Sequence, residues 1–412
     1  KLRTMRHWPL LNIALRNLGR NRGRTLAAVL TVASGVVAYL LAGGYINWVF
    51  EDMREATIHS QLGHIQIVRP QFFDKGIADP YRFLLPADDK EPEAVRSLPG
   101  FVSLAPRLTF SGLINRGDTT ITFSGEGIDP VGEKPITTRI TLLEGKDLQS
   151  SNEKSVMLGE GLAQSLGARP GDTVVLLTTT ATGRASAVEV TVAGIFATVT
   201  KEYDDYALRL PIQQARKLMR ADSATSWVVV LDQWQRTDPA VEQLRATLPA
   251  KDFEIVPWHA LSDFYNKTVE LFKKQVHVVR VIIGLIIILT ISNTLTMTVL
   301  ERTTEIGTGL AIGLRRGKIM RMFIIEGGLI GLVGGILGVI VGYLLGSIIS
   351  AIGIPMPPAP GMAHGYTAGI VISPQLAIDA FILSVVTTLL ASGFPAWKAG
   401  RMNIVDALRY GQ

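Results

Sequence analysis

The sequence contains no cysteine and comparatively few charged residues. Without cysteine the chain forms no disulfide, offers no thiol nucleophile and supplies no thiolate ligand to a metal, although this does not identify its compartment. Asp, Glu, Lys and Arg make up 18% of the 412 residues, whereas 47% are hydrophobic, which is unusual for a soluble chain of this length. The composition therefore favours a membrane protein.

The hydrophobic residues gather in four long segments without charge: 25–50, 281–300, 327–354 and 380–397. Each segment is long enough to cross a hydrocarbon core of about 30 Å as an α-helix. With their flanks, they predict transmembrane helices at residues 25–50, 276–300, 322–354 and 376–397.

Lys and Arg are concentrated on one side of these predicted helices. Residues 1–24 hold seven basic residues and no acid, 301–321 hold five against two acids, and 398–412 hold three against one. By the positive-inside rule, these three segments are expected in the cytoplasm. Residues 51–275 are then outside, with 25 basic and 30 acidic residues. The overall charge of +6 follows from this topology, so nucleic-acid binding is not needed to explain it.

Residues 1–24 carry an apolar stripe with arginines beside it. Four apolar residues recur every three or four positions, namely Trp8, Leu11, Leu15 and Leu18. This spacing predicts an amphipathic helix in the inner membrane surface. The simpler alternative is a basic flank that only fixes the topology.

Residues 51–275 alternate between strand-like and helix-like patterns. Strand-like patterns cover 63–68, 119–124, 173–177, 188–195 and 227–231, and helix-like patterns cover 160–166, 212–219 and 239–248. Such alternation predicts a large α+β extracytoplasmic domain with a mostly open sheet. The domain contains no GxSxG, HExxH or glycine-rich phosphate loop. His64 is interpreted as a structural histidine, because no second ligand stands at metal spacing.

A helical pattern from Trp258 to Val279 continues directly into the second predicted membrane helix. It is expected to form a stalk, the alternative being an ordinary docking helix. The outer connection at 355–375 is rich in proline and free of Lys and Arg, so it is interpreted as a lipid-contacting loop or a stiff linker.

The third hydrophobic segment has glycines at intervals of four residues. Small residues at this spacing let membrane helices approach closely. We therefore expect helix packing at Gly331, Gly334, Gly335, Gly338 and Gly342. Glu326 is interpreted as a carboxylate at the cytoplasmic edge and not as part of a proton relay, because no ionisable partner lies deeper in the segment.

Four short motifs together resemble one protein family. ERTTEIG at 301–307 is followed by AIG at 311–313, and PAWKA at 395–399 is followed by Asn403 and by DALR at 406–409. NIALRNL at 12–18 and GHIQI at 63–67 precede them. In this order they resemble the FtsX-like permeases of ABC transporters of the lipoprotein-releasing (Lol) and macrolide-exporter (MacB) types. GHIQI and the long outer region resemble the Lol branch.

The resemblance implies that residues 301–321 form a cytoplasmic coupling loop that contacts an ATPase. No GxxxxGK[ST] motif occurs, so the ATPase is expected on a separate polypeptide. By motif position, the coupling residues are Glu301, Arg302, Glu305, Ile306, Gly307, Leu310, Ala311 and Gly313. Gly309-Leu310 replaces a usual Leu-Arg pair, which implies a more apolar and deformable coupling contact. Ile404 replaces a usual proline, which implies a less sharply set final turn.

The resemblance also implies the assembly and its role. We expect a multi-pass protein of the bacterial inner membrane, with a cytosolic ATPase dimer that holds ATP and Mg and with a second copy or a sister permease. The chain itself is not expected to be an enzyme or to hold a cofactor or metal. Its expected role is extraction or export of a lipoprotein, lipid or other amphipathic substrate. The alternative is a mechanotransmitting permease that activates an extracytoplasmic hydrolase without transport.

Overall fold

The computed structural model describes residues 14, 16–20, 22–76, 79–85, 91–180, 183–358 and 365–403. The chain divides into two compact units: a membrane unit of residues 1–50, 269–355 and 367–412, and an outer unit of residues 51–268 and 356–366. Predictions for Trp8, Leu11, Leu15 and residues 404–412 lie outside the described residues.

Four long apolar helices dominate the membrane unit: α2 (Arg22–Thr57), α9 (Asp263–Glu301), α11 (Arg316–Ile352) and α12 (Pro374–Gly400). They are the helices, within the described ranges, that are long and apolar enough to span a bilayer. The predicted number of spans is thereby confirmed. Both α2 and α9 continue into the outer unit, because the unit boundaries at residues 50 and 268 fall inside them.

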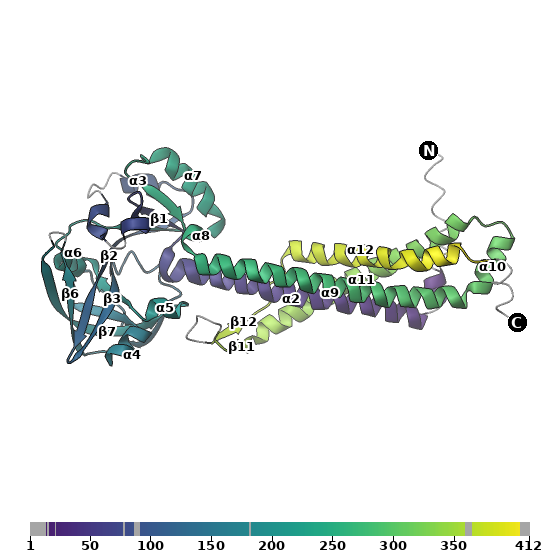
Figure 1. Ribbon diagram of the computed structural model, residues 1–412, viewed down its shortest axis with the longest axis horizontal. Coiled ribbons are helices and arrows are strands. Elements are labelled where there is room, and N and C mark those ends of the chain that lie inside the picture. The colour runs from purple at the N-terminus through teal and green to yellow at the C-terminus, as the bar shows by residue number, and fades with distance from the viewer. Residues whose placement is uncertain are drawn as a thin grey trace. The chain divides into compact units, whose positions relative to one another are not determined.

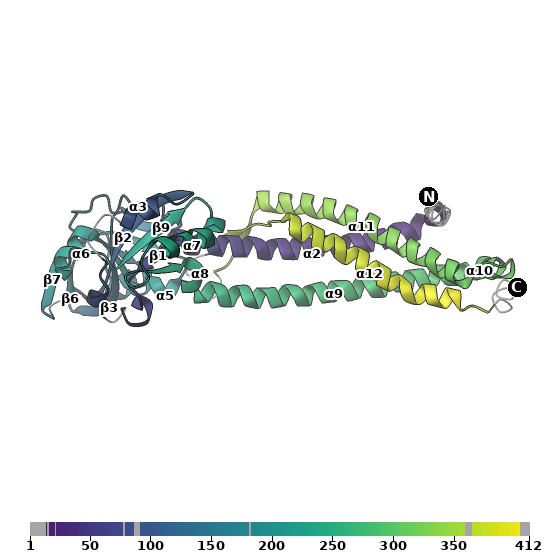
Figure 2. The same ribbon diagram turned by 90° about the horizontal axis from the view of Figure 1, so that it is seen from above.

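The glycines of α11 form two packing faces. Gly327, Gly331 and Gly335 lie against the small polar residues Ser392, Thr388 and Ser384 of α12, whereas Gly334, Gly338 and Gly342 lie against Val32, Val36 and Leu40 of α2. A Cβ on Gly338 would lie 2.6 Å from the Cβ of Val36, closer than two carbon atoms can pack. Figures 1 and 2 show α11 and α12 side by side along this contact.

A ten-stranded sheet forms the centre of the outer unit (Figure 1). Its strands are β1 (Ile65–Val68), β2 (Phe101–Arg116), β3 (Thr119–Ile128), β4 (Thr141–Gly145), β5 (Ser155–Gly159), β6 (Thr173–Thr179), β7 (Ala185–Ala197), β8 (Ala207–Pro211), β9 (Ser226–Leu231) and β10 (Glu254–Pro257). They pair in the order β10-β1-β9-β2-β3-β8-β5-β7-β4, and β6 pairs with both β2 and β7.

The expectation of a mostly open sheet is wrong, because these pairings close a ring of β2, β3, β8, β5, β7 and β6. The length of β2 makes the closure possible. Residues 101–107 of β2 pair with β9, whereas residues 112–115 pair with β6. One strand therefore belongs both to the closed ring and to the three-stranded extension β9-β1-β10.

Each part of the sheet has its own apolar core. Side chains from the ring pack with α4 (Glu160–Leu166) and α6 (Ile212–Met219). Those from β1, β9 and β10 pack with α3 (Glu91–Arg96) and α7 (Thr237–Thr247). The predicted helices 160–166 and 212–219 are confirmed at both ends, and Gly167 ends α4 in the left-handed region at φ 64°.

Two connections differ from the predictions. The predicted helix from Trp258 is interrupted at Ser262, so a short α8 (Trp258–Leu261) precedes α9, which begins at Asp263. The proline-rich connection contains a two-stranded sheet of β11 (Ile354–Met356) and β12 (Tyr366–Ala368).

Candidate functional site

A short helix, α10 (Thr303–Ala311), lies between α9 and α11. Its residues Ile306 and Leu310 are four positions apart and therefore share one helix face. Both are buried, and they pack in a cluster that contains Phe323 and Ile319 of α11 and two alanines of α12. Gly307 is buried as well. Three of the predicted coupling residues thus support α10 from within the membrane unit.

The other side of α10 is exposed at Thr304, Glu305, Thr308 and Ala311. Gly313, at φ 98°, then turns the chain before α11 begins at Arg316. Beside this turn the side chains of Ile312 and Leu314 are 80% and 46% exposed. We call Ile312 and Leu314 the loop tip. Two neighbouring large apolar side chains that no described residue covers are suited to contact with a protein partner.

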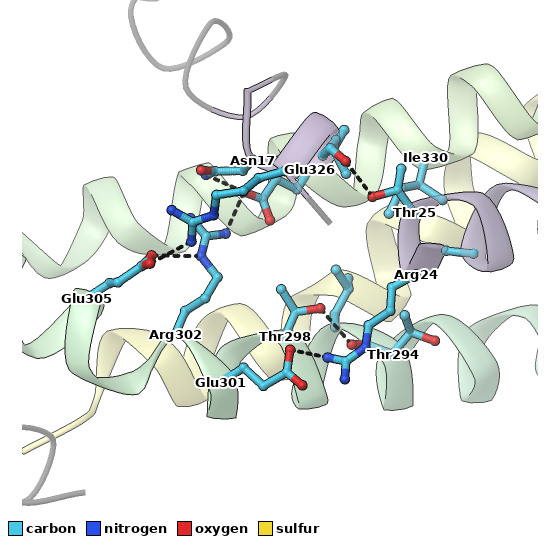
Figure 3. Close-up of a pocket in the computed structure, with 14 residues that line it drawn as sticks. Asn17, Arg24, Thr25, Thr294, Thr298, Glu301, Arg302, Glu305, Glu326 and Ile330 are labelled. Carbon is cyan, nitrogen blue, oxygen red and sulfur yellow. Dashed lines mark hydrogen bonds and ion pairs between the residues drawn. The ribbon is translucent and has the colours of Figure 1, made fainter. Parts of the chain in front are cut away.

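Six charged residues lie around the junction of α9 and α10, and Figure 3 shows Arg24, Glu301, Arg302, Glu305 and Glu326 among them. We call them the loop cluster: Arg20, Arg24, Glu301, Arg302, Glu305 and Glu326. Arg24 pairs with Glu301, and Arg20 approaches a carboxylate oxygen of Glu305 to 2.6 Å. Arg302 lies 3.3 Å from Glu305 and 3.1 Å from Glu326. These residues border a cavity of about 200 Å³.

Glu326 differs from its sequence-based interpretation. The sequence placed it at the edge of the helix, where a carboxylate costs little, but only 2% of it is exposed. Its Oε1 accepts hydrogen bonds from the Asn17 amide at 2.8 Å and from Arg302 at 3.1 Å. A buried carboxylate is tolerated when it is paired and hydrogen-bonded in this way.

The ionisation of Glu305 follows from its position in the loop cluster. Partial burial acts to raise the pKa of Glu305, but hydrogen bonds and charges from Arg20 and Arg302 outweigh it and lower the pKa. Glu305 is therefore ionised at neutral pH. By formal charge, the three arginines of the loop cluster balance its three glutamates.

Sequence reasoning singled out Glu301, Arg302 and Glu305 but missed their partners. Arg20 and Arg24 were assigned only to the basic N-terminal segment, and Asn17 was assigned to that segment and to the NIALRNL motif. A signal was present in the charges, since an arginine-rich segment and an acidic pair were both predicted at the same membrane face. Their pairing is a tertiary contact between residues 285 positions apart in the case of Arg20 and Glu305.

A second set of charged residues surrounds the end of α2 in the outer unit. After Thr57 the chain continues as the short helix η2 (Ile58–Leu62). The carbonyls at its end have no partner within the helix and carry partial negative charge, as at any helix C-terminus. Arg209 donates to the Ser60 carbonyl at 2.9 Å, and Arg107 donates to the Gln61 carbonyl.

The two arginines are residues of the sheet, and each has a glutamate as its ionic partner. Arg107 on β2 approaches the Glu133 carboxylate to 2.6 Å, with both side chains almost completely buried. Burial alone would lower the pKa of Arg107, but Glu133 and Glu126 raise it, so the guanidinium stays charged. Arg209 on β8 lies 3.8 Å from Glu126. We call Arg107 and Arg209 the arginine pair.

Further contacts fix the same helix end. Arg139 lies 2.9 Å from Asp52, and its backbone N–H donates to the His59 carbonyl. The Arg54 guanidinium lies 4.1 Å from the centre of the Trp234 ring. His64 is buried just beyond η2, and its Nδ1 accepts a hydrogen bond from the Leu231 backbone N–H at 3.2 Å.

Comparison with known proteins identifies two domains. Residues 25–247 match the MacB-like periplasmic core domain, and residues 278–404 match the FtsX-like permease C-terminal domain. An ABC transporter permease of Methanocaldococcus jannaschii is 22% identical over 434 aligned positions, with 97% of each chain covered. The lipoprotein-releasing system transmembrane protein LolC of Neisseria meningitidis is 23% identical over 75% of this chain and 74% of its own.

Two proteins of the MacB type are also similar. The macrolide export ATP-binding/permease protein MacB of Sodalis glossinidius is 26% identical over 97% of this chain, which spans 60% of that protein. Among solved structures, the periplasmic region of MacB from Actinobacillus actinomycetemcomitans has a TM-score of 0.36 and 16% identity, over 52% of this chain and 95% of that one.

Proposed function

Because the chain belongs to the family of ABC transporter permeases with a MacB-like periplasmic core and an FtsX-like permease domain, we propose that it couples a separate ATPase to substrate movement. The substrate is a lipoprotein, a lipid or another amphipathic molecule at the outer face of a bacterial inner membrane. In this proposal, residues 301–321 are cytoplasmic and the outer unit is periplasmic.

The observation that carries the proposal is the exposed loop tip. Ile306 and Leu310 are buried inside the membrane unit, so they hold α10 in place and leave Ile312 and Leu314 for the ATPase. Burying one such side chain contributes about 1.5–3 kcal/mol. Glu305 and Arg302 set the orientation of α10 through the loop cluster.

The end of α2 supports a mechanical role for the outer unit. α2 is one uninterrupted helix from Arg22 to Thr57, and the arginine pair binds the carbonyls of the turn that follows it. A displacement of the end of α2 therefore acts on β2 and β8, which belong to the closed ring. This arrangement suits a permease in which movement of the outer domain performs the work on the substrate.

The similarity to LolC, which covers 74% of that protein, supports a lipoprotein or lipid as the substrate. Such a substrate presents acyl chains at the membrane surface. The proposed substrate class is tested by identifying the molecules that co-purify with the complex. A bound acylated molecule is expected, whereas a stably bound hydrolase without any lipid would favour activation of that hydrolase.

The coupling contact is tested by Ile312→Asp. We expect this change to weaken binding of the ATPase by about tenfold to a hundredfold, since it removes the burial of one large apolar side chain. Because Ile312 is 80% exposed, the chain should still insert and fold. The measurement is ATPase binding and ATP turnover of the purified complex in lipid nanodiscs.

The matched control is Val131→Asp, the same kind of change at an outer-unit residue that is 67% exposed. It should leave ATPase binding at the wild-type level. Unchanged binding by Ile312→Asp, or an equal loss in both variants, would contradict the assignment of the loop tip.

A further inference from the structure

The cavity at the loop cluster changes in polarity along its length. One part carries the charged side chains of the loop cluster. The other part is lined by Ala28 of α2, Leu295 of α9 and Ile330 of α11, which lie inside the predicted membrane-spanning segments. A cavity that runs from apolar helix surfaces to charged groups has the polarity of the boundary between lipid tails and lipid headgroups.

The rim of the cavity is open and its floor is closed. Four rim side chains are between 43% and 61% exposed, namely Arg20, Arg24, Glu301 and Glu305. Glu326 also lines the cavity but is 2% exposed, and Figure 3 shows it across the cavity from Arg24 and Glu301. The cavity volume of about 200 Å³ is several times the roughly 30 Å³ that one water molecule takes up in the liquid. The cavity therefore has room for a small polar group.

One oxygen of the buried Glu326 carboxylate has no donor among the described residues. Its Oε1 accepts from both Asn17 and Arg302, at 2.8 and 3.1 Å, whereas no hydrogen bond reaches Oε2 within that part of the chain. Leaving a buried acceptor without a donor is costly, and the cost is larger for a charged group. Oε2 is therefore suited to a ligand that brings an N–H or O–H group to the floor of the cavity.

The exposed arginines offer the opposite chemistry. Arg20 contacts Glu305 and Arg24 contacts Glu301, each through one guanidinium nitrogen. A guanidinium carries more N–H donors than one such contact uses, so both arginines keep donors for a phosphate. Because arginines and glutamates balance in the loop cluster, a ligand with one positive and one negative group complements the cavity better than an anion does.

We propose that this cavity binds the headgroup of phosphatidylethanolamine, a phosphate followed closely by a primary ammonium. The phosphate lies at Arg20 and Arg24, and the ammonium donates to Oε2 of Glu326. The lipid comes from the leaflet beside residues 301–321, because the apolar part of the cavity lies at the level of the membrane-spanning segments. A soluble amine would leave that part uncovered.

The bound headgroup joins the arginines near the start of α2 to Glu326 of α11, and so stabilises the loop cluster beside α10. It is a lipid of the surrounding leaflet and not the transported substrate. The site also does not include the loop tip. Lipid binding and ATPase binding are therefore measured separately, and either proposal can fail without the other.

A series of lipids with successive N-methyl groups tests the ammonium site. The full-length chain is purified and titrated with phosphatidylethanolamine, its monomethyl and dimethyl derivatives and phosphatidylcholine, all with the same acyl chains, and bound lipid is read by native mass spectrometry. The first three keep an N–H donor and should bind with similar affinity. Phosphatidylcholine has the same charges but no N–H, so it should bind about tenfold to a hundredfold more weakly, the loss of one hydrogen bond to a charged group.

Glu326→Gln tests which oxygen makes the contact. The amide oxygen of the glutamine should take the position of Oε1, where Asn17 and Arg302 both donate, which places the NH₂ group at the position of Oε2. A donor then faces the ammonium. The affinity for phosphatidylethanolamine should fall to that for phosphatidylcholine, while the affinity for phosphatidylcholine should stay within about twofold.

Arg24→Gln tests the phosphate site. It should weaken binding of phosphatidylethanolamine and phosphatidylcholine equally, by about threefold to tenfold, because both lipids carry the same phosphate. The matched control is Arg316→Gln, at an exposed arginine of α11 that does not line the cavity. It should leave the affinity for both lipids unchanged.

Three results would overturn the proposal. Equal binding of phosphatidylethanolamine and phosphatidylcholine by the wild-type chain would show that no N–H group is recognised and that water fills the cavity. Tighter binding of phosphatidylglycerol with the same acyl chains would make the ligand an anionic lipid. Displacement of the lipid by free phosphoethanolamine at the same concentration would make it a soluble amine. The comparisons among lipids use the wild-type chain, so they remain decisive if a variant fails to fold.

Discussion

We expect the free energy of unfolding to fall by different amounts when Arg302 or Glu326 of their ion pair is replaced. Glu326 is 2% exposed, and without Arg302 its remaining hydrogen-bond donor in the described structure is the Asn17 amide. Arg302→Met should therefore lower the free energy of unfolding by about 3–5 kcal/mol, the cost of leaving a buried charge unpaired.

Glu326→Met should cost less. The Arg302 side chain is 14% exposed and keeps Glu305 at 3.3 Å, so its charge remains partly solvated and partly paired. We expect a loss of about 1–2 kcal/mol, since one charge-assisted hydrogen bond is removed without an isolated charge. The double variant removes both charges and replaces them with apolar side chains of similar length. It should return to within about 1 kcal/mol of the wild type.

The assay is reversible unfolding in mixed micelles with increasing dodecyl sulfate, applied to all four proteins as a double-mutant cycle. The control is Arg24→Met, at an ion pair in which both side chains are well exposed, where the loss should be at most about 1 kcal/mol. A larger loss for Glu326→Met than for Arg302→Met, or additive losses in the double variant, would refute this account of the buried pair.

Two further changes test the packing and the pH response. Gly338→Ala should lower the melting temperature although alanine is the better helix former, because its Cβ would lie 2.6 Å from Val36 Cβ. Gly393→Ala is the control and should not lower the melting temperature, because no neighbour lies within 4 Å of its Cβ. Equal effects of the two changes would contradict the packing of α11 on α2. Burial lowers the pKa of His64 to about 4 from 6.5. The unfolded chain therefore binds a proton first, and up to about 3 kcal/mol of stability is lost as the pH falls from 6.5 to 4. Burial raises the pKa of Asp204 to about 6, which acts in the opposite direction, so unfolding is best followed in Asp204→Asn. His64→Gln in that background should abolish the loss, and persistence of the loss would assign it to another group.

Local patterns were sufficient for several elements of the outer unit. α4 and α6 begin and end as predicted because their apolar residues repeat at helical spacing, and Gly167 provides a left-handed end for α4. β2 was missed because its sixteen residues contain Pro106, Gly112 and the buried Arg107, which interrupt the alternation expected of a strand. The closure of the sheet depends on β6 pairing with both β2 and β7, and no local pattern encodes such distant pairings.

The candidate site was predictable as a position but not as a set of contacts. Charge and hydropathy located residues 301–321 between two membrane helices, and the family motif singled out Glu301, Arg302 and Glu305. The motif could not show that Ile306 and Leu310 are buried. They lie in a short loop, and the residues that cover them come from α11 and α12. The same limitation applied to Glu326, whose position near a helix end suggested solvent but whose partners bury it.

The contacts along α2 differ in kind from its beginning to its end. Near its start Arg24 pairs with Glu301, and just beyond its end the Ser60 and Gln61 carbonyls accept hydrogen bonds from the arginine pair. Between these sites Val32, Val36 and Leu40 pack on the glycine face of α11 through van der Waals contacts.

Directional polar contacts at both ends resist separation more strongly than a smooth apolar contact resists sliding. We propose that a shift of the loop cluster moves α2 along the glycine face. Among the described residues, the glycines of α11 pack closely against α2 without hydrogen bonds between the two helices, and this supports the proposed sliding.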